Sequence, residues 1–248
     1  MIPVINLGPL SLPAPQLILI IGLWLGASLA ERQVKKAGRK SEILFKIIWT
    51  AVLAGVLGAR LSFVARNPSA FQGQWISIFS LNQSLLDPAG GLMIASVAGY
   101  FVALKYRQSS WALLDDLVPF LAVLAPALFL SNFASGSGYG TITDLPWGID
   151  LWGGLRHPVQ LYYMVASLVV LILAISRNRL KQQIAGAFML SFIVLTSGYL
   201  TVFSAFQDPA GNLIAGFRVI QLIYWMLFTS SIFTYNNLTI RGSENASG

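Results

Sequence analysis

The sequence predicts an all-α integral membrane protein with seven transmembrane helices and a small extracytoplasmic loop or head region. Of the 248 residues, 56% are hydrophobic and 10% are charged, and the mean hydropathy is +0.70. Soluble domains are about 25% charged, so this composition indicates a membrane protein. Seven apolar runs are long enough to cross a hydrocarbon core of about 30 Å as helices. They are predicted near 14–30, 43–65, 90–104, 111–130, 158–175, 184–206 and 214–235.

The first three runs have features that bear on membrane insertion and on helix packing. The amino terminus lacks the basic segment and the small-residue cleavage site of a signal peptide, so we expect the first run to remain as a helix. The second run contains Gly55 and Gly58, and the third opens with Gly90 and Gly91. Glycines of this kind let two helices approach closely, and we predict that they do so here.

Two connecting segments have a composition suited to the membrane surface. Segment 71–88 spreads apolar residues among polar ones, which predicts an interfacial helix lying flat. The segment from Ser131 to Arg156 is rich in glycine and contains two tryptophans, so it predicts a compact loop that could form a lid or binding surface.

Two acids, Asp115 and Asp116, begin the fourth run. Acids favour the amino end of a helix, so we predict a structural role for both. Lys105 or Arg107 could pair with them.

The distribution of basic residues predicts the orientation of the chain. Eleven of them fall in alternate connections and in the tail, namely Arg32, Lys35, Lys36, Arg39, Lys40, Lys105, Arg107, Arg177, Arg179, Lys181 and Arg241. The opposite side has only Arg60, Arg66, Arg156 and Arg218. We therefore predict an amino terminus outside and a carboxyl terminus in the cytoplasm. The net charge of +7 then reflects membrane insertion, and nucleic acid is not expected as a partner.

The scarcity of metal-ligating side chains excludes several kinds of chemistry. With no cysteine there is no disulfide, no thiolate nucleophile and no thiolate metal site. A single histidine excludes an imidazole cluster, so neither a metal nor another cofactor is predicted. No repeat or linker divides the chain, and we predict one transmembrane domain over residues 1–248.

The most informative stretch runs from Arg156 to Tyr162. It places a cation and the only histidine, His157, directly before the apolar residues of the fifth run. Pro158 suits a helix start because it has no amide hydrogen to leave unpaired. Histidine is the side chain that ordinarily titrates near neutrality. The stretch is therefore a candidate reaction or ligand site at the water–lipid boundary; the alternative is that Arg156 and His157 only cap a helix and touch headgroups.

Several segments together resemble the bacterial prolipoprotein diacylglyceryl transferases over nearly the whole chain. The matching segments, in the order of the family, are 5–12, 57–61, 90–92, the pair Asn132-Phe133 with Gly140 and 143–148, then 156–162, and 207–209. The resemblance implies transfer of a diacylglyceryl group from phosphatidylglycerol to the cysteine sulfhydryl of a lipoprotein precursor. It also implies a multi-pass protein of the bacterial cytoplasmic (inner) membrane.

This chain departs from the family at ionisable positions. By the resemblance, Ala89 stands where the family has a histidine, and Phe129 stands where it has an arginine. Ser137 replaces a glutamate of the family, and Tyr163 replaces an acid. The aromatic residue that the family has near the start of its first helix falls close to Pro15. In the sixth run the arginine and glutamate of the family fall on Leu200 and Ser204, or, with a one-residue gap, on Thr201 and Ala205. Losing several partners of a reacting phosphate should bring transfer near the background rate.

The polar residues that remain define the candidate site. His157 is the candidate base; Arg60, Asn132, Arg156, Gln160 and Tyr162 are candidates for lipid or phosphate binding; Gly140 and Asp144 are candidate loop positions. Arg60 stands out because a cation inside an apolar run usually faces a partner or a watery cavity.

Three functions are open. We favour a member that has lost transfer and acts as a phospholipid-binding protein or as an assembly subunit beside other membrane proteins. The alternative is an active transferase with a rearranged site, in which His157 is the base and Arg60 and Arg156 hold the phosphate. A transporter of small solutes or lipids is third, because intramembrane acids are scarce.

Overall fold

The structure is a computed structural model, and it describes residues 4–7, 10–73, 75–79, 85–106, 110–151, 153–176, 184–208, 213–214 and 217–247. Within these residues the chain forms two compact units. The first unit comprises Met1–Ala30 and Leu114–Gly248, and the second comprises Glu31–Leu113. The helix α1 begins in the first unit and continues into the second.

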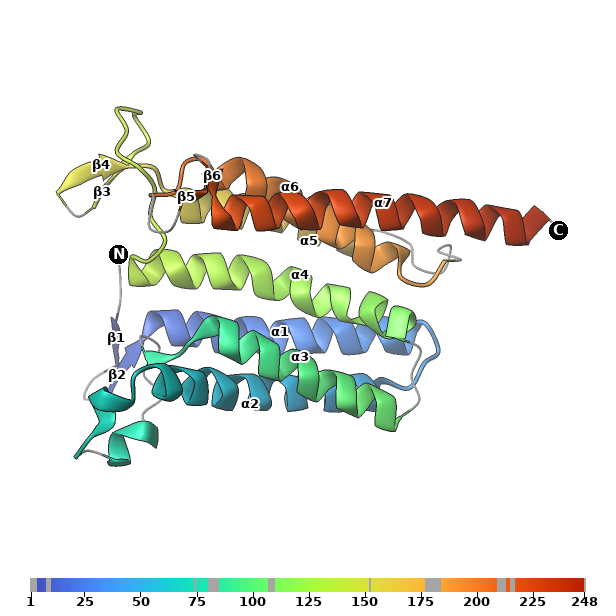
Figure 1. The fold of residues 1–248 in the computed structure, drawn as a ribbon, viewed down its shortest axis with the longest axis horizontal. Coiled ribbons are helices and arrows are strands. Elements are labelled where there is room, and N and C mark those ends of the chain that lie inside the picture. The colour runs from blue at the N-terminus through green and yellow to red at the C-terminus, as the bar shows by residue number, and fades with distance from the viewer. Residues whose placement is uncertain are drawn as a thin grey trace. The chain divides into compact units, whose positions relative to one another are not determined.

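Helices dominate the described part of the chain (Figure 1). The α-helices are α1 (Ala14–Lys36), α2 (Ser41–Arg66), α3 (Pro88–Lys105), α4 (Ser110–Ser135), α5 (Val159–Ser176), α6 (Ala187–Ser204) and α7 (Val219–Ser247). Two short 3-10 helices follow α2, η1 (Pro68–Phe71) and η2 (Trp75–Phe79). The strands form three antiparallel hairpins: β1 (Val4–Leu7) with β2 (Leu10–Pro13), β3 (Ile149–Leu151) with β4 (Gly154–Arg156), and β5 (Leu213–Ile214) with β6 (Phe217–Arg218).

The helices confirm the predicted class of an all-α integral membrane protein. Six of the seven described α-helices, α1 to α6, are long and apolar enough to cross a membrane. Many large apolar side chains on them are exposed, as lipid-facing surfaces require, for example Leu57 at 63% and Ile172 at 63%. The helix α7 is longer but less apolar, so its membrane crossing stays a prediction, as does the orientation of the chain.

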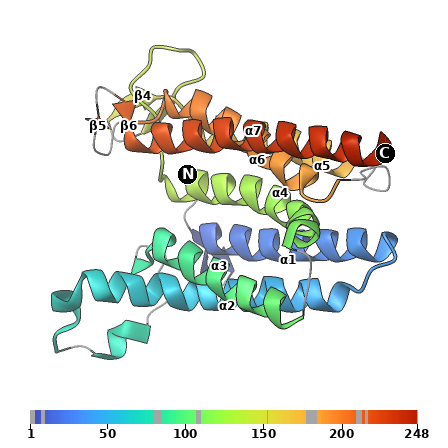
Figure 2. The ribbon, with the colours of Figure 1, turned by 45° about the vertical axis from the view of Figure 1, so that its right-hand side comes forward.

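In the first unit, α5, α6 and α7 lie side by side (Figures 1 and 2). Its core contains the buried residues Val118, Ala122, Ala174, Phe188 and Met189 from α4, α5 and α6. The helix α1 packs closely on α4, because a Cβ on Gly26 would lie only 2.9 Å from the carbonyl oxygen of Phe120. The first unit therefore brings together helices that are far apart in the sequence.

In the second unit, glycines hold α2 and α3 together, as the sequence predicts. A Cβ on Gly58 would lie 2.5 Å from the Cβ of Ile94, and one on Gly91 would lie 2.8 Å from the Cβ of Ala59. Distances this short leave no room for a larger side chain. The absence of a Cβ at these positions thus allows the backbones of α2 and α3 to approach.

Several predicted boundaries of helices and connections are wrong. The helix α1 extends to Lys36, so Arg32, Lys35 and Lys36 lie on the helix and not in a connection. Likewise α4 extends to Ser135, and the predicted loop loses its first five residues, Ser131–Ser135, to that helix. Charged or polar residues end the apolar run before the backbone hydrogen bonds of the helix end, which explains both differences.

The predicted interfacial helix over 71–88 is also wrong for its described part. Residues 68–71 and 75–79 form two separate 3-10 helices, with Gly73 between them at a φ of 85°. A positive φ interrupts a right-handed helix, and glycine adopts it without steric cost. Residues 74 and 80–84 of the segment lie outside the described residues, and Pro88 at its end begins α3.

Asp115 has a structural role, as predicted, but it acts on another helix. Its carboxylate accepts hydrogen bonds from the backbone amides of Gly186, at 2.7 Å, and Met189, at 2.8 Å. These amides lie at the start of α6, where the first turn leaves its N–H groups unpaired. Asp115 therefore caps α6 from α4. It does not lie at the start of its own helix, because α4 begins at Ser110. The pairing of Asp115 and Asp116 with Lys105 or Arg107 stays a prediction, and Arg107 lies outside the described residues.

Candidate functional site

The candidate site in the first unit is built on a short backbone platform. Residues 139–143 lie between segment 155–157, which leads into α5, and segment 206–208, which follows α6. The amide of Gly140 donates to the carbonyl of His157, and the amide of Thr141 donates to that of Phe206. The loop after α4 thus ties the amino end of α5 to the carboxyl end of α6.

Gly140, a predicted loop residue of the site, is at the centre of this platform. A Cβ at Gly140 would lie 2.5 Å from the Cβ of His157, 2.6 Å from Cγ2 of Val159 and 2.7 Å from the carbonyl oxygen of His157. Only glycine fits so close to a neighbouring backbone. This position therefore sets the distance between the loop and the histidine.

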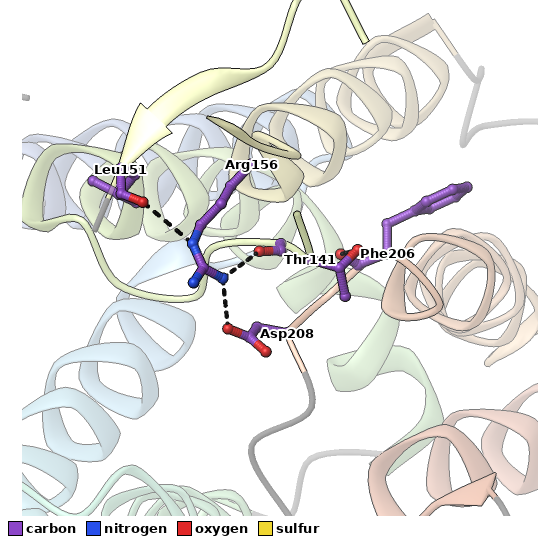
Figure 3. A network of polar contacts seen from close by, with 6 residues as sticks. Thr141, Leu151, Arg156, Phe206 and Asp208 are labelled. Carbon is purple, nitrogen blue, oxygen red and sulfur yellow. Dashed lines mark hydrogen bonds and ion pairs between the residues drawn. The ribbon is translucent and has the colours of Figure 1, made fainter. Parts of the chain in front are cut away.

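Arg156 is held by an acid and two carbonyl groups (Figure 3). Its Nη1 donates to Oδ2 of Asp208 at 2.8 Å and to the carbonyl of Gly140 at 3.3 Å, while Nε donates to the carbonyl of Leu151 at 3.2 Å. The guanidinium also lies over the ring of Tyr139. Asp208 thus neutralises much of the charge that a bound phosphate would need.

His157 belongs to a short hydrogen-bonded chain. Its Nδ1 lies 3.2 Å from the hydroxyl oxygen of Tyr162, which also accepts a hydrogen bond from Nε1 of Trp147 at 2.9 Å. The ring of His157 packs against Phe206, with centroids 5.2 Å apart. If the Tyr162 hydroxyl donates to Nδ1, the proton of a neutral imidazole is on Nε2; if Nδ1 donates, Nε2 is free to accept a proton.

The other predicted site residues of the first unit, Gln160, Asn132 and Asp144, differ in their surroundings. Gln160 is buried, and its amide donates to the carbonyl of Ser137 at 2.8 Å. The backbone carbonyl of Asn132 accepts hydrogen bonds from Ser135 and Ser137 at the end of α4. Asp144 is exposed. The platform therefore brings Gly140, Arg156, His157 and Tyr162 together, and Gln160 serves the loop backbone.

An aromatic cluster fills the space between α4, α5 and α6 beside this platform. Phe129 and Tyr163 stack with ring centroids 4.9 Å apart and planes at 23°. Tyr199 packs edge-on to Phe129 at 6.3 Å, and Phe203 contacts both Tyr162 and Tyr163. Positions 129 and 163 are two of those where the family resemblance places ionisable residues. Here they form an uncharged stack.

Arg60 lies in the second unit, where backbone carbonyl groups surround its guanidinium. Nε donates to the carbonyl of Ile78 at 2.7 Å, Nη1 donates to that of Leu85 at 2.8 Å, and Nη2 donates to that of Ser77. The residue is 5% exposed, and its guanidinium also lies over the ring of Phe71. These contacts anchor the segment after η1 to α2, and a phosphate-binding role for Arg60 stays a prediction.

Asp87 organises the start of α3 in the same unit. Its carboxylate accepts a hydrogen bond from the Ser62 hydroxyl and one from the amide of Ala89, and it pairs with Arg66 at 3.4 Å. The hydrogen bond from Ser62, with the charge of Arg66, holds the pKa of Asp87 below its usual value. Ala89, which precedes the paired glycines, thus donates its amide to the N-cap residue Asp87. By the resemblance, this position would hold a histidine.

The structure adds two residues to the platform that the sequence does not single out. Asp208 pairs with Arg156, and its place directly before Pro209 in a segment that resembles the family is the only sequence signal for it. Trp147 donates to the hydroxyl of Tyr162, a contact between the loop and α5 that depends on tertiary structure.

The first unit also contains an apolar cavity. An apolar cavity of about 560 Å³ lies between α5, α6 and α7, lined by Leu173, Phe192 and Ile232 among others, away from His157. Within the described residues no three His, Asp or Glu side chains gather to hold a metal ion.

Comparison with known proteins agrees with the family resemblance. The family model for prolipoprotein diacylglyceryl transferase matches residues 3–236. The phosphatidylglycerol–prolipoprotein diacylglyceryl transferase of Geobacter sulfurreducens is 29% identical over 206 residues, which cover 78% of this chain and 79% of that protein. The proteins of the same name from Clostridioides difficile and Campylobacter jejuni strain 81-176 are 28% identical over 183 residues (73% of each chain) and 26% identical over 235 residues (87% and 85%). The match spans nearly the whole chain, so the protein belongs to the prolipoprotein diacylglyceryl transferase family.

Proposed function

We propose that this member of the family binds a phospholipid at the outer end of α4 to α6 and does not transfer its diacylglyceryl group. The observation that carries the proposal is the stack of Phe129 on Tyr163, 4.9 Å apart. By the resemblance these positions would hold an arginine and an acid. Two stacked rings offer apolar surface and one hydroxyl group, which suit an acyl or glyceryl moiety better than a reacting phosphate.

The chemistry of transfer explains why this stack matters. The cysteine thiol must lose its proton, its sulfur must form a bond to the glyceryl carbon, and the bond from that carbon to the phosphate oxygen must break. The leaving glycerol phosphate takes up negative charge, which cations or aimed donors have to stabilise. Arg156, the cation on the platform, already faces the carboxylate of Asp208 at 2.8 Å. Arg156 therefore has little charge left to stabilise the leaving phosphate in transfer.

One observation favours the alternative, a working transferase with His157 as the base. The pair formed by His157 and Tyr162, at 3.2 Å, fixes the imidazole ring at the platform. In the tautomer that donates from Nδ1, Nε2 can take the thiol proton. The donor lipid and the lipoprotein cysteine would then have to reach Nε2 from the bilayer.

A transfer assay with the purified protein separates the two functions. Labelled phosphatidylglycerol and a peptide with a lipoprotein-type cysteine are incubated with the wild type and with His157→Ala, and thioether product and bound lipid are both measured. We expect phospholipid to copurify and no product to form above background. Product that falls by about 10²-fold or more in His157→Ala would establish the transferase and overturn the proposal.

A further inference from the structure

We propose that Arg218 is the residue that binds the phosphate of an anionic phospholipid in the first unit, with the hydroxyl groups of Tyr163 and Tyr224 as additional donors. This inference rests on the proposed phospholipid binding, and it names the group that recognises the headgroup. It gives the role predicted for Arg60 and Arg156 to Arg218, which lies outside the segments that resemble the family.

A comparison of the arginines on the predicted outer side supports this choice. Arg60 donates to three backbone carbonyls, Arg156 pairs with Asp208, and Arg66 pairs with Asp87. The guanidinium of Arg218 makes one hydrogen bond to a described residue, from Nη1 to the carbonyl of Ser204 at 2.5 Å. Within the described part of the chain, Nε and Nη2 of Arg218 and its full positive charge are therefore available to a ligand.

The position of Arg218 is half-buried and fixed by its neighbours. It ends the short strand β6 directly before Val219, the first residue of α7. Its backbone amide donates to Oε1 of Gln221 at 3.3 Å, and its side chain reaches the carboxyl end of α6 at Ser204. The guanidinium is thus held between α6 and α7.

Tyr163 and Tyr224 belong to the same unit as this cation. Tyr163 is 5% exposed and lies within electrostatic range of Arg218, Tyr224 and Tyr199. The hydroxyl groups of Tyr163 and Tyr224 have no hydrogen-bond partner among the residues that the structure describes. The first unit therefore offers two phenolic hydroxyls as donors in addition to the guanidinium of Arg218.

This set of groups selects the chemistry of the ligand. A cation that is partly removed from water, with only a carbonyl dipole as partner, gains most from an anion that brings several acceptor oxygens. A phosphate diester has one negative charge and such oxygens. The neighbouring helices α5 and α6 have the length and apolarity of membrane spans, and the stack of Phe129 on Tyr163 supplies apolar surface next to the donors. We therefore assign the anion to a membrane phospholipid and not to a free solute.

The experiment compares lipid preference in matched variants. Wild type, Arg218→Gln, Arg218→Lys and the control Arg66→Gln are reconstituted in nanodiscs of phosphatidylcholine with a minor fraction of phosphatidylglycerol, and bound lipids are counted by native mass spectrometry. Arg66 has a side chain that is 68% exposed, so its replacement removes the same charge from the surface. We expect Arg218→Gln to lose the preference for the anionic lipid by about tenfold or more, Arg218→Lys to retain part of it, and Arg66→Gln to match the wild type.

The outcomes separate this inference from the function on which it rests. If wild type binds phosphatidylglycerol and Arg218→Gln, folded and monodisperse, binds it equally well, Arg218 is not the phosphate ligand, while phospholipid binding stands. If wild type binds no phospholipid, both proposals fail. Competition with inorganic phosphate and glycerol 3-phosphate distinguishes the sources: displacement of the lipid by millimolar free anion would overturn the assignment to a lipid, and its retention supports it.

Discussion

At the scale of single residues, Arg60 and Arg156 have the same functional group, but their surroundings determine different uses. Arg60 is surrounded by carbonyl groups of its own unit, and Arg156 faces the carboxylate of Asp208 at 2.8 Å. A guanidinium has five donors in a fixed plane, and each donor that a protein carbonyl occupies is lost to a ligand. Residue type alone therefore overstates the number of candidate phosphate ligands.

Gly140 provides a test at the same scale. We expect Gly140→Ala to destabilise the first unit by about 1–3 kcal/mol, because the new methyl group would overlap the Cβ of His157 and force the loop away from α5. The thermal unfolding midpoint in detergent and the protection of the His157 amide from hydrogen exchange report the change. Gly154→Ala is the control, since its Cβ would have no neighbour closer than 3.9 Å. Equal midpoints for the two variants would contradict the close packing at Gly140.

At the scale of elements, the start of α6 depends on a side chain from another helix. Asp115 on α4 accepts hydrogen bonds from two amides at the start of α6, at 2.7 and 2.8 Å. Gly186, which precedes α6, has a φ of 91° and no side chain that could cap the helix. The cap is therefore supplied by tertiary structure, which couples α4 to α6.

Replacement of this cap should loosen α6. We expect Asp115→Ala to lower the stability by about 1–2 kcal/mol, because two amides lose a charged acceptor. Hydrogen exchange over residues 186–190 should rise, and it is measured by mass spectrometry. Asp150→Asn removes the charge of an exposed acid on β3 and serves as the control. If exchange over 186–190 in Asp115→Ala matches that of the control, Asp115 is not the cap.

At the scale of the whole molecule, the protein is a multi-pass protein of the bacterial cytoplasmic membrane, as the family and the six apolar helices together indicate. Which side each connection faces stays a prediction from the basic residues. The role as an assembly subunit beside other membrane proteins likewise stays a prediction. The single domain over residues 1–248 also stays a prediction, and the described residues divide into two compact units.

The absence of cysteine makes the orientation directly testable. Single cysteines are placed at Asp144, in the loop after α4, and at Lys40, between α1 and α2, and both positions are exposed. With the predicted orientation, a membrane-impermeant maleimide labels Asp144→Cys in intact cells, and it labels Lys40→Cys only after the membrane is opened. The reverse pattern would show that the chain is inserted the other way round.

The membrane class and the family follow from the sequence by itself. Apolar runs of sufficient length predict spanning helices because lipid offers no partner for an unpaired backbone amide. The glycines that join α2 to α3, and the order of the family motifs, are likewise local features that can be read along the chain. The helix ends were less predictable, because hydrogen bonding continued for several polar residues beyond the apolar runs, as in α1 and α4.

Only the tertiary structure decided which polar groups are available for function. Asp208 neutralises Arg156 from 52 positions away in the chain, and carbonyl groups from the segment after η1 occupy Arg60. Arg218 ends the strand β6, and its side chain reaches the carbonyl of Ser204 at the end of α6, 14 positions away in the chain. Electrostatic and hydrogen-bond energies depend on separations of a few ångströms, which sequence spacing does not determine between distant segments. The choice among the four arginines on the predicted outer side therefore required the folded chain.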